Sequence, residues 1–340
     1  MRTRISVAAA IVVAAAIAAG IVAAGQTARS AAARYRGTIA FVRVDGALYV
    51  IHADGSGLRR VTPPGMDVSD YAWSPDARRI AYIDRGGSLW LVRPDGEGRK
   101  RLLAGSITLA SSALSWSPNG RTIAITSRGA MGSCAGKQIY VVPIDGASPR
   151  KVRGASPACD LFAWSPRGNL IAYSDTDGHG FWVVHPDGSG RRRVSSQGGA
   201  GWVRWSADGN QLAFAVAIRK RNRWHHLHGG IAVVDVDGRG FHIVTRHANN
   251  ENPAVWSPTG HRLLYGRWNH GGIYVIGAKG RSDRRVTTES SDALAWSPDG
   301  GAIIYATSTG GLDEVGIDGR GKVQLTSPGT GDFDPSWVGR

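Results

Sequence analysis

A tryptophan phrase that returns at a nearly constant spacing is the feature that most constrains the fold of this chain. Six copies read Trp-Ser-Pro or Trp-Ser-Ala, and a seventh tryptophan follows Asp-Pro-Ser near the end of the chain. The successive tryptophans are 43, 48, 41, 51, 40 and 41 residues apart. A repeat of about 40 residues built only from short strands is typical of β-propeller blades. The tryptophans are Trp73, Trp116, Trp164, Trp205, Trp256, Trp296 and Trp337.

Each repeat contains the same strands and turns. The tryptophan phrase ends a first strand, and the Ser-Pro-Asp-Gly that follows predicts a turn in which proline fixes φ and glycine takes the left-handed conformation. A second strand such as Arg79–Tyr82 and a third such as Leu89–Val92 come next. An Asp-Gly hairpin turn, as at Asp95, leads into a short fourth strand such as Arg284–Thr287. The pattern predicts four antiparallel strands in every repeat.

The two ends of the chain hold complementary parts of one blade. Thr38–Val42 reads as a second strand with no tryptophan strand before it, whereas Trp337 ends a first strand with nothing after it. An open ring would leave a bare strand edge, so we expect the two segments to pair. The prediction is an all-β fold, a seven-bladed β-propeller of four-stranded antiparallel blades closed by its terminal segments. Six blades is the alternative.

Three phrases together carry a family resemblance: Trp-Ser-Pro-Asp-Gly, Ile-Ala-Tyr as at Ile171–Tyr173, and Ile-Tyr-Val-x-x-x-Asp-Gly as at Ile139–Gly146. From about residue 37 to residue 340 the chain resembles the TolB-like, WD-repeat-like β-propellers of bacteria. Members of that family include periplasmic components of envelope-maintenance machinery and the non-catalytic propellers of some peptidases and lyases. The resemblance implies the fold and a location outside the cytoplasm, and it leaves the function open.

Residues 1–33 differ from the rest and read as a leader. Arg2 and Arg4 precede an uncharged apolar stretch, Ile5–Gly25, and small residues follow at Ala31–Ala33. This pattern predicts a secretory signal peptide, and the alternative is an uncleaved membrane anchor because the stretch is long enough to span a bilayer. Either form places the propeller outside the cytoplasm, where it would be periplasmic, at the cell surface or secreted.

The chain is strongly basic, with a formal net charge of +15. Much of this charge recurs at the start of each predicted fourth strand, which is the outermost strand of its blade. Charged side chains there prevent edge-to-edge pairing, so a structural role is favoured over nucleic-acid binding, which needs a clustered patch with aromatic platforms. The basic pairs and triplets are Arg59-Arg60, Arg99-Lys100-Arg101, Arg150-Lys151, Arg191-Arg192-Arg193 and Arg284-Arg285.

Strand order predicts which loops share a face of the ring. In an antiparallel blade, loops that enter the first strand and loops that join the second and third strands emerge together. We call this side the variable face, because it carries the insertions, and the side with the Ser-Pro-Asp-Gly and Asp-Gly turns the turn face. Binding sites are commonly built from variable loops on a rigid scaffold. The turn face reads as structural.

Five acidic residues lie three to five positions before successive tryptophans and are expected to surround the channel mouth on the variable face. Such a ring would bind a cation or a basic peptide. The alternative is that these side chains only secure the turns that enter the strands. The five residues are Asp70, Asp160, Glu251, Asp292 and Asp334.

A second candidate binding site on the variable face combines two loops rich in arginine, tryptophan and histidine. Arginine and tryptophan suit an anionic or glycan ligand, although a solvated loop without function is the alternative. The histidines have no carboxylate or cysteine within the loop to complete a metal site, so no metal is expected. The residues are Arg219, Arg221, Arg223, Trp224, His225, His226 and His228 in one loop, and Arg267, Trp268 and His270 in the next.

The chain has two cysteines, Cys134 and Cys159, which fall in variable-face loops of adjacent blades. An even pair in an exported protein predicts a disulfide. A bridge of this kind stabilises by limiting the unfolded chain, on the order of 2–4 kcal/mol.

The motifs of common enzymes are missing from the sequence. No serine has glycine at both −2 and +2, and nothing matches a phosphate loop or a His-Glu-x-x-His helix. We therefore expect a non-catalytic, monomeric binding propeller without a cofactor. Its partner would be a protein or a cell-envelope component, with membrane contact only through the N-terminal segment. The alternatives are a glycan- or peptide-directed enzyme, metal-assisted in one version, and a binder of anionic polymers; nucleic acid is not expected.

Overall fold

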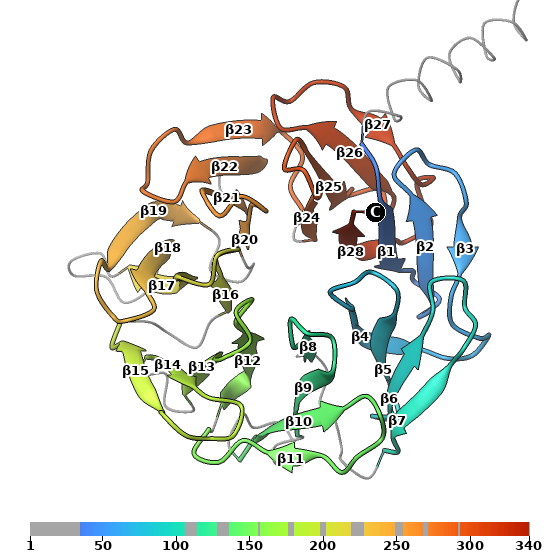
Figure 1. Ribbon diagram of the computed structural model, residues 1–340. Helices are drawn as coiled ribbons and strands as arrows, with labels where there is room; N and C mark the ends of the chain where they lie inside the picture. The colour runs from blue at the N-terminus through green and yellow to red at the C-terminus, as the bar shows by residue number, and fades with distance from the viewer. Residues whose placement is uncertain are drawn as a thin grey trace, which may run out of the picture.

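A computed structural model describes residues 35–105, 114–127, 136–155, 157–175, 180–197, 202–218, 228–248, 254–267, 271–291 and 293–339. The strands of this part form seven four-stranded antiparallel sheets around an open centre (Figure 1). The seven-bladed propeller is therefore confirmed, and the six-bladed alternative is wrong. No helix within these ranges is long and apolar enough to cross a membrane.

Blades 1 to 3 run from the inner to the outer strand in chain order. Blade 1 is β4 (Val68–Trp73), β5 (Ile80–Asp84), β6 (Leu89–Val92) and β7 (Lys100–Leu103). Blade 2 is β8 (Leu114–Trp116), β9 (Thr122–Thr126), β10 (Ile139–Pro143) and β11 (Arg150–Lys151). Blade 3 is β12 (Pro157–Trp164), β13 (Ile171–Asp175), β14 (Phe181–Val184) and β15 (Arg192–Ser195).

Blades 4 to 6 repeat this arrangement, and blade 7 joins the two ends of the chain. Blade 4 is β16 (Val203–Trp205), β17 (Gln211–Ile218), β18 (His228–Asp235) and β19 (His242–Ala248). Blade 5 is β20 (Val255–Trp256), β21 (Arg262–Gly266), β22 (Ile273–Gly277) and β23 (Arg284–Thr287). Blade 6 is β24 (Leu294–Trp296), β25 (Ala302–Ala306), β26 (Leu312–Gly316) and β27 (Val323–Gln324). Blade 7 is β28 (Phe333–Val338), β1 (Thr38–Val42), β2 (Leu48–His52) and β3 (Arg59–Arg60).

The ring closes as the sequence predicts. The C-terminal strand β28 pairs with β1 in antiparallel register, with Ile39 opposite Trp337 and Ala40 opposite Ser336. The register shifts by a bulge between Ala40 and Val42. Beside this seam, Arg43 donates to the buried carboxylate of Asp332 over 2.6 Å and 3.2 Å. The closure thus combines strand pairing with an ion pair that also joins the two ends of the chain.

The tryptophans pack between blades and also link neighbouring backbones. All seven are buried, with at most 8% of their surface exposed. In five blades the indole Nε1–H donates to the carbonyl oxygen of the residue just before the tryptophan of the preceding blade. Examples are Trp116 to Ala72 over 3.1 Å and Trp205 to Ala163 over 2.9 Å. Trp164 instead donates to Gly168 O of its own turn. Because a buried indole needs both apolar packing and an acceptor, one residue type serves both purposes.

The serine and the acidic or amide residue of the phrase lock the turn that follows each tryptophan. The Ser74 hydroxyl donates to Asp76 Oδ1 over 2.6 Å, and the backbone N–H groups of Arg78 and Arg79 donate to Asp76 and Ser74. The same bonds recur around Ser117 and Ser297. The hydroxyl and carboxyl oxygens satisfy backbone donors that the turn leaves unpaired. This explains why the repeat keeps serine and aspartate at these positions.

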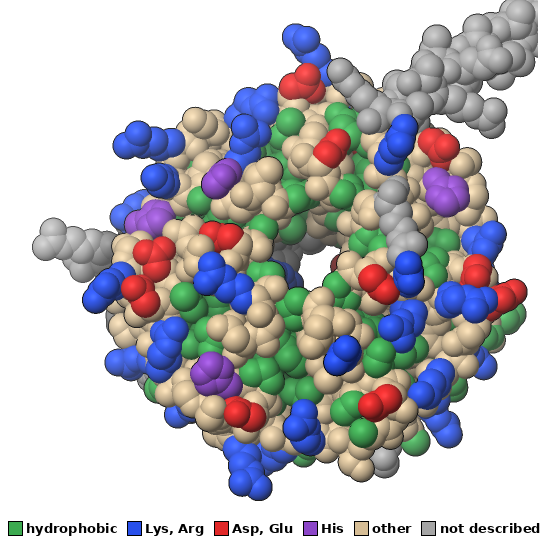
Figure 2. Space-filling view, viewed as in Figure 1, with side chains coloured by type: hydrophobic (Ala, Val, Ile, Leu, Met, Phe, Trp, Pro, Cys, Tyr) green, Lys and Arg blue, Asp and Glu red, His purple; other side chains and the backbone are tan. Residues whose placement is uncertain are grey.

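The basic residues of the fourth strands lie on the rim, as expected. Lys and Arg side chains are spread around the circumference of the ring rather than gathered in one patch (Figure 2). Several pack on aromatic rings of the third strand: the Arg191 guanidinium lies 3.8 Å from the Trp182 ring centroid, and that of Arg99 lies 4.8 Å from Trp90. These contacts cover the outer strands and spread the positive charge.

Glu314 is a buried departure from the repeat. It lies on the third strand of blade 6, where the other six blades hold the aliphatic residues Val50, Leu91, Val141, Val183, Val233 and Val275. Only 1% of its surface is exposed, and Oε2 has no hydrogen-bond partner within the described ranges. Leu312, on the same side of the strand, packs against Ile39 and Phe41 of blade 7. Burial, and then the nearby Asp299 carboxylate, raises the pKa of Glu314 to about 8.

The first prediction concerns ring closure. Deleting residues 331–340 removes β28, the packing of Trp337 and the partner of Arg43, so the melting temperature should fall sharply. Loss of the tryptophan burial alone corresponds to on the order of 3–5 kcal/mol. Deleting only residues 339–340 leaves β28 in place and should have little effect. An unchanged melting temperature after the longer deletion would show that the termini do not close the ring.

The second prediction concerns Glu314. Its folded-state pKa of about 8 lies above the ordinary value of 4.5, so folding loses stability as pH rises between these two values. The Glu314→Gln variant removes the charge and should melt at a higher temperature than the parent at pH 9. The free-energy gain should be about 1.4 kcal/mol for each pKa unit of the shift. At pH 4 the two proteins should melt alike, and a gain that is equal at both pH values would contradict the raised pKa.

Candidate functional site

The inner strands of the seven blades surround a central channel (Figure 1). Two predicted acidic residues on these strands lie close enough for their charges to interact. Asp70 in β4 and Asp334 in β28 both lie three residues before the tryptophan of their strand. Because blades 1 and 7 are neighbours in the ring, equal offsets place the two carboxyl groups at corresponding positions. Their charges interact, and the Asp334 carboxylate raises the pKa of Asp70. The structure therefore brings together two members of the predicted acidic ring.

The environment of Asp70 favours its protonated form near neutral pH. Burial in the channel wall, and then the Asp334 carboxylate, raises the pKa of Asp70 to about 7. Two backbone N–H groups oppose this shift: that of Tyr71 donates to Asp70 Oδ1 over 2.8 Å, and that of Leu114 in blade 2 donates as well. Asp70 thus connects the inner strands of blades 1 and 2 and takes up a proton close to physiological pH.

Asp334 is held in an unusual backbone conformation. Its φ is 52°, in the left-handed region that non-glycine residues seldom adopt. The Tyr71 hydroxyl lies 2.8 Å from Ala40 O and 2.5 Å from Asp334 O, which ties blade 1 to the closing blade at this point. Asp334 is exposed to solvent in the channel. The protein atoms around it still reduce its hydration, and this desolvation raises the pKa of its carboxyl group as well. Backbone strain of this kind is concentrated at functional sites.

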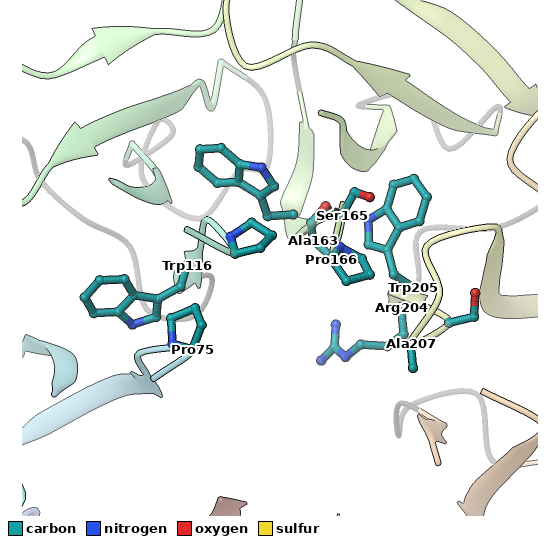
Figure 3. A pocket seen from close by; sticks show the side chains of 11 residues that line it. Pro75, Trp116, Ala163, Ser165, Pro166, Arg204, Trp205 and Ala207 are labelled. Atoms are coloured by element: carbon teal, nitrogen blue, oxygen red, sulfur yellow. Dashed lines mark hydrogen bonds between the residues drawn. The ribbon is translucent and has the colours of Figure 1, made fainter. Parts of the chain in front are cut away.

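A cation on the far wall of the channel completes the site. Arg204 in β16 of blade 4 extends into the open centre (Figure 3). It lies three blades away from Asp70 around the ring, so its charge reaches Asp70 and Asp334 only across the channel, where it lowers the pKa of both carboxyl groups. The sequence analysis missed Arg204. Comparing the repeats would have found it, because every other blade has a small or aliphatic residue before the tryptophan.

The other members of the acidic ring are not placed by the structure. Asp160 belongs to strand β12, but its side chain is not described. Glu251 and Asp292 lie outside the described residues. The positions of these three stay predictions, and Asp70 and Asp334 are the two predicted residues whose side chains the structure describes.

The two basic loops contribute one described side chain, Arg267, and it is engaged within the protein. Arg267 forms an ion pair with Asp283, donates to the Tyr265 hydroxyl over 2.7 Å and stacks on Tyr274 at 4.0 Å. Its guanidinium is therefore already paired within the protein, and its predicted role in ligand binding stays a prediction. His228 begins β18, and its side chain is not described. Outside the described residues lie Arg219, Arg221, Arg223, Trp224, His225, His226, Trp268 and His270.

The disulfide and the metal expectations are not decided by the structure. Cys134 lies outside the described residues, and Cys159 lies within β12 itself rather than in the loop before it. The disulfide stays a prediction. Within the described ranges, no group of three or more histidine, cysteine, aspartate or glutamate side chains is arranged to hold a metal ion.

Comparison with known proteins agrees with this architecture. A family model described as the TolB beta propeller domain matches residues 30–294. TolB from Acinetobacter baumannii superposes with a TM-score of 0.57 at 18% identity, covering 89% of this chain and 67% of its own. An oligogalacturonate lyase in complex with manganese superposes with a TM-score of 0.63 at 13% identity, and the match covers 77% of this chain and 79% of the lyase chain. A chain of a nidogen/laminin complex superposes with a TM-score of 0.52 at 15% identity, and the match covers 73% of this chain and 92% of that chain. No curated protein matches significantly.

The third prediction uses two aspartates with opposite pKa shifts. The pKa of Asp70 is raised from 3.8 to about 7, so its ionisation costs stability as pH rises through that range. The Asp70→Asn variant should gain stability at pH 8, on the order of 1–2 kcal/mol because channel solvent screens the charge, and little at pH 3.5.

Asp76 is the matched control on the turn face. The Ser74 hydroxyl, followed by the backbone N–H of Arg78, lowers the pKa of Asp76, so its carboxylate stabilises the fold above that pKa. The Asp76→Asn variant should lose stability at pH 7, and the loss should shrink as pH falls toward 3. Thermal melts across this range test both variants. The same sign for the two would refute the assignment of Asp70.

Proposed function

We propose a function from the premise that this chain belongs to the TolB beta propeller domain family. The protein is a non-catalytic, extracytoplasmic binding propeller that presents its variable face to a protein or cell-envelope partner. The extracytoplasmic location is supported by the apolar segment Ile5–Gly25, whose flanks are those of an export signal or anchor. The partner-binding role is supported by the surface around the Asp70–Asp334 pair.

The observation that carries the proposal is an acidic and apolar surface at the channel mouth. Phe333, directly before Asp334, is 46% exposed, and Val44 of the β1–β2 loop is 76% exposed. Phe333 pairs with Val42 across the closing strands, and Val44 lies against Gly331, so both residues flank the seam of the ring. Exposed apolar side chains beside a charged pair are typical of interaction sites.

The charges of this surface select a basic partner segment. The Arg204 charge on the opposite wall lowers the pKa of both Asp70 and Asp334, but this guanidinium forms no ion pair with either carboxyl group within the described ranges. A lysine or arginine of the partner would neutralise the pair, and an adjacent apolar side chain would cover Phe333. Because the protein as a whole is basic, with a formal net charge of +15, the Asp70–Asp334 pair is a local region of negative charge that attracts a basic segment of the partner and orients it toward this face.

The fold alone does not choose between binding and catalysis, since propellers support both. The solved structures that resemble this chain include TolB and an oligogalacturonate lyase, each at less than 20% identity. The proposal therefore rests on the site. A rigid ring that fixes two carboxyl groups beside exposed apolar residues is suited to recognising a complementary surface, because little conformational freedom is lost on binding.

The fourth prediction tests this site by crosslinking in cell-envelope extracts with the full chain as bait. The Asp70→Asn/Asp334→Asn double variant should lower partner recovery about tenfold, corresponding to one or two lost charge contacts. Recovery by the unaltered protein should also weaken from pH 8 to pH 6, as Asp70 takes up a proton. The double variant should lack this pH dependence.

The matched control is the Asp237→Asn/Asp318→Asn double variant. Both residues are in exposed Asp-Gly turns of the turn face, where each accepts a backbone N–H two residues later. This variant should recover the partner as well as the unaltered protein does. Equal recovery by all three proteins, or crosslinks that map only to the turn face, would overturn the proposal.

A further inference from the structure

A shallow cavity of about 400 Å³ is lined by residues of the tryptophan turns, which belong to the turn face (Figure 3). It follows the inner ends of the tryptophan turns through blades 1 to 4. Its apolar walls are Pro75, Pro118 and Pro166 together with the rings of Trp116, Trp164 and Trp205. The repeated turns predict only a structural role for this face, so the cavity is a feature that the tertiary structure reveals.

Blade 4 departs from the repeat at two positions, and both line this cavity. Before the tryptophan it has Arg204, where the other blades have Ala72, Ser115, Ala163, Val255, Ala295 and Ser336. After the Trp-Ser pair it has Ala207, where five other blades have proline. The fold does not require either change, since six blades form the same strand without the arginine and five form the same turn with proline. Departures from a local rule at one place are expected at functional sites.

The Arg204 charge is not neutralised where it stands. Its only hydrogen bond within the described ranges runs to the neighbouring Val203 carbonyl over 3.0 Å, and no described carboxylate lies within ion-pair distance. Its side chain is open to channel solvent, yet protein surrounds it closely enough that desolvation lowers its pKa. A guanidinium has five N–H donors, so most of its hydrogen-bonding capacity is available to a ligand.

The chemistry around Arg204 narrows the class of ligand. A planar carboxylate matches the guanidinium fork. A dianionic phosphate is disfavoured because Asp70 and Asp334 face Arg204 across the channel. The proline and tryptophan walls require an apolar group beside the anion. A chain end satisfies all three conditions, because it combines a monoanionic carboxylate with one side chain and enters an axial opening as a single strand.

We propose that this cavity binds the C-terminal residue of a partner polypeptide, with its α-carboxylate on Arg204 and an apolar side chain against Pro166 and Trp205. The inference rests on the proposed function only in taking a polypeptide as partner, and it uses the opposite face of the ring. Ala207 in place of proline leaves room for the incoming residue at the edge of the cavity.

The probes are synthetic tetrapeptides, Ac-Gly-Ser-Gly-Phe with a free C-terminal carboxylate and the same peptide with a C-terminal amide. Matching free acids ending in Leu, Val and Ser vary the apolar group, and inorganic phosphate tests the anion. Binding to the full chain is followed by titration calorimetry. The Phe, Leu or Val free acid should bind about tenfold or more tightly than the amide and than the Ser peptide, and more tightly than phosphate.

The variants separate the two departures in blade 4. Arg204→Gln should weaken free-acid binding about 10- to 100-fold and leave amide binding unchanged. Ala207→Pro restores the residue of the other blades, so it should keep the melting temperature while weakening binding. Arg78→Gln, an exposed turn-face arginine outside the cavity, is the control and should change nothing.

The inference would be overturned by no binding of any free acid, by equal binding of acid and amide, or by binding that Arg204→Gln leaves unchanged. Tighter binding of phosphate than of the free acids would also overturn it. If the peptides fail while envelope crosslinks still depend on Asp70 and Asp334, the proposed function stands without this cavity. If those crosslinks fail while the peptides bind through Arg204, the cavity stands alone.

Discussion

The hydrogen bond from a buried tryptophan to the inner strand of the preceding blade is the interaction on which the ring depends. In five of the seven blades the indole Nε1–H reaches the carbonyl of the residue before the neighbouring tryptophan, as from Trp296 to Val255 over 3.0 Å. The same ring fills the apolar layer between blades. Packing and a directed bond thus act at one position, which sets both the spacing and the angle between successive sheets.

Because the packing between blades constrains most repeat positions, residues that differ from the repeat mark places where another property has been favoured. Glu314 replaces an aliphatic residue in the layer between blades 6 and 7. Its Oε2 atom has no hydrogen-bond partner within the described ranges. Arg204 and Ala207 replace a small residue and a proline at the inner end of blade 4. The Arg204 carbonyl still accepts the indole N–H of Trp256 over 3.2 Å, so its backbone keeps the common role while its side chain is released for another.

The channel gives the protein two different openings. Asp70 and Asp334 stand toward the variable face, with Phe333 exposed beside them, and Arg204 stands at the end lined by tryptophans and prolines. Burial is the largest cause of the pKa shifts of all three groups, raising those of Asp70 and Asp334 and lowering that of Arg204, and the attraction between Arg204 and the two carboxyl groups partly offsets these shifts. The two openings therefore differ in both charge and apolar lining, which allows one rigid ring to recognise different chemical groups on its two faces.

The sequence by itself determined the blade count, the strand order, the turns and the closure by Thr38–Val42 and Trp337, because each follows from local periodicity and turn chemistry. It also predicted Asp70 and Asp334, among five acidic residues that lie three to five positions before a tryptophan. Only the tertiary structure decided that Arg204 faces these carboxyl groups, that Glu314 is buried between blades 6 and 7 and that Arg267 pairs with Asp283. The first fact depends on ring closure, which brings residues more than a hundred positions apart to opposite walls of one channel. All three depend on side-chain packing, and periodicity along the chain carries no information about it.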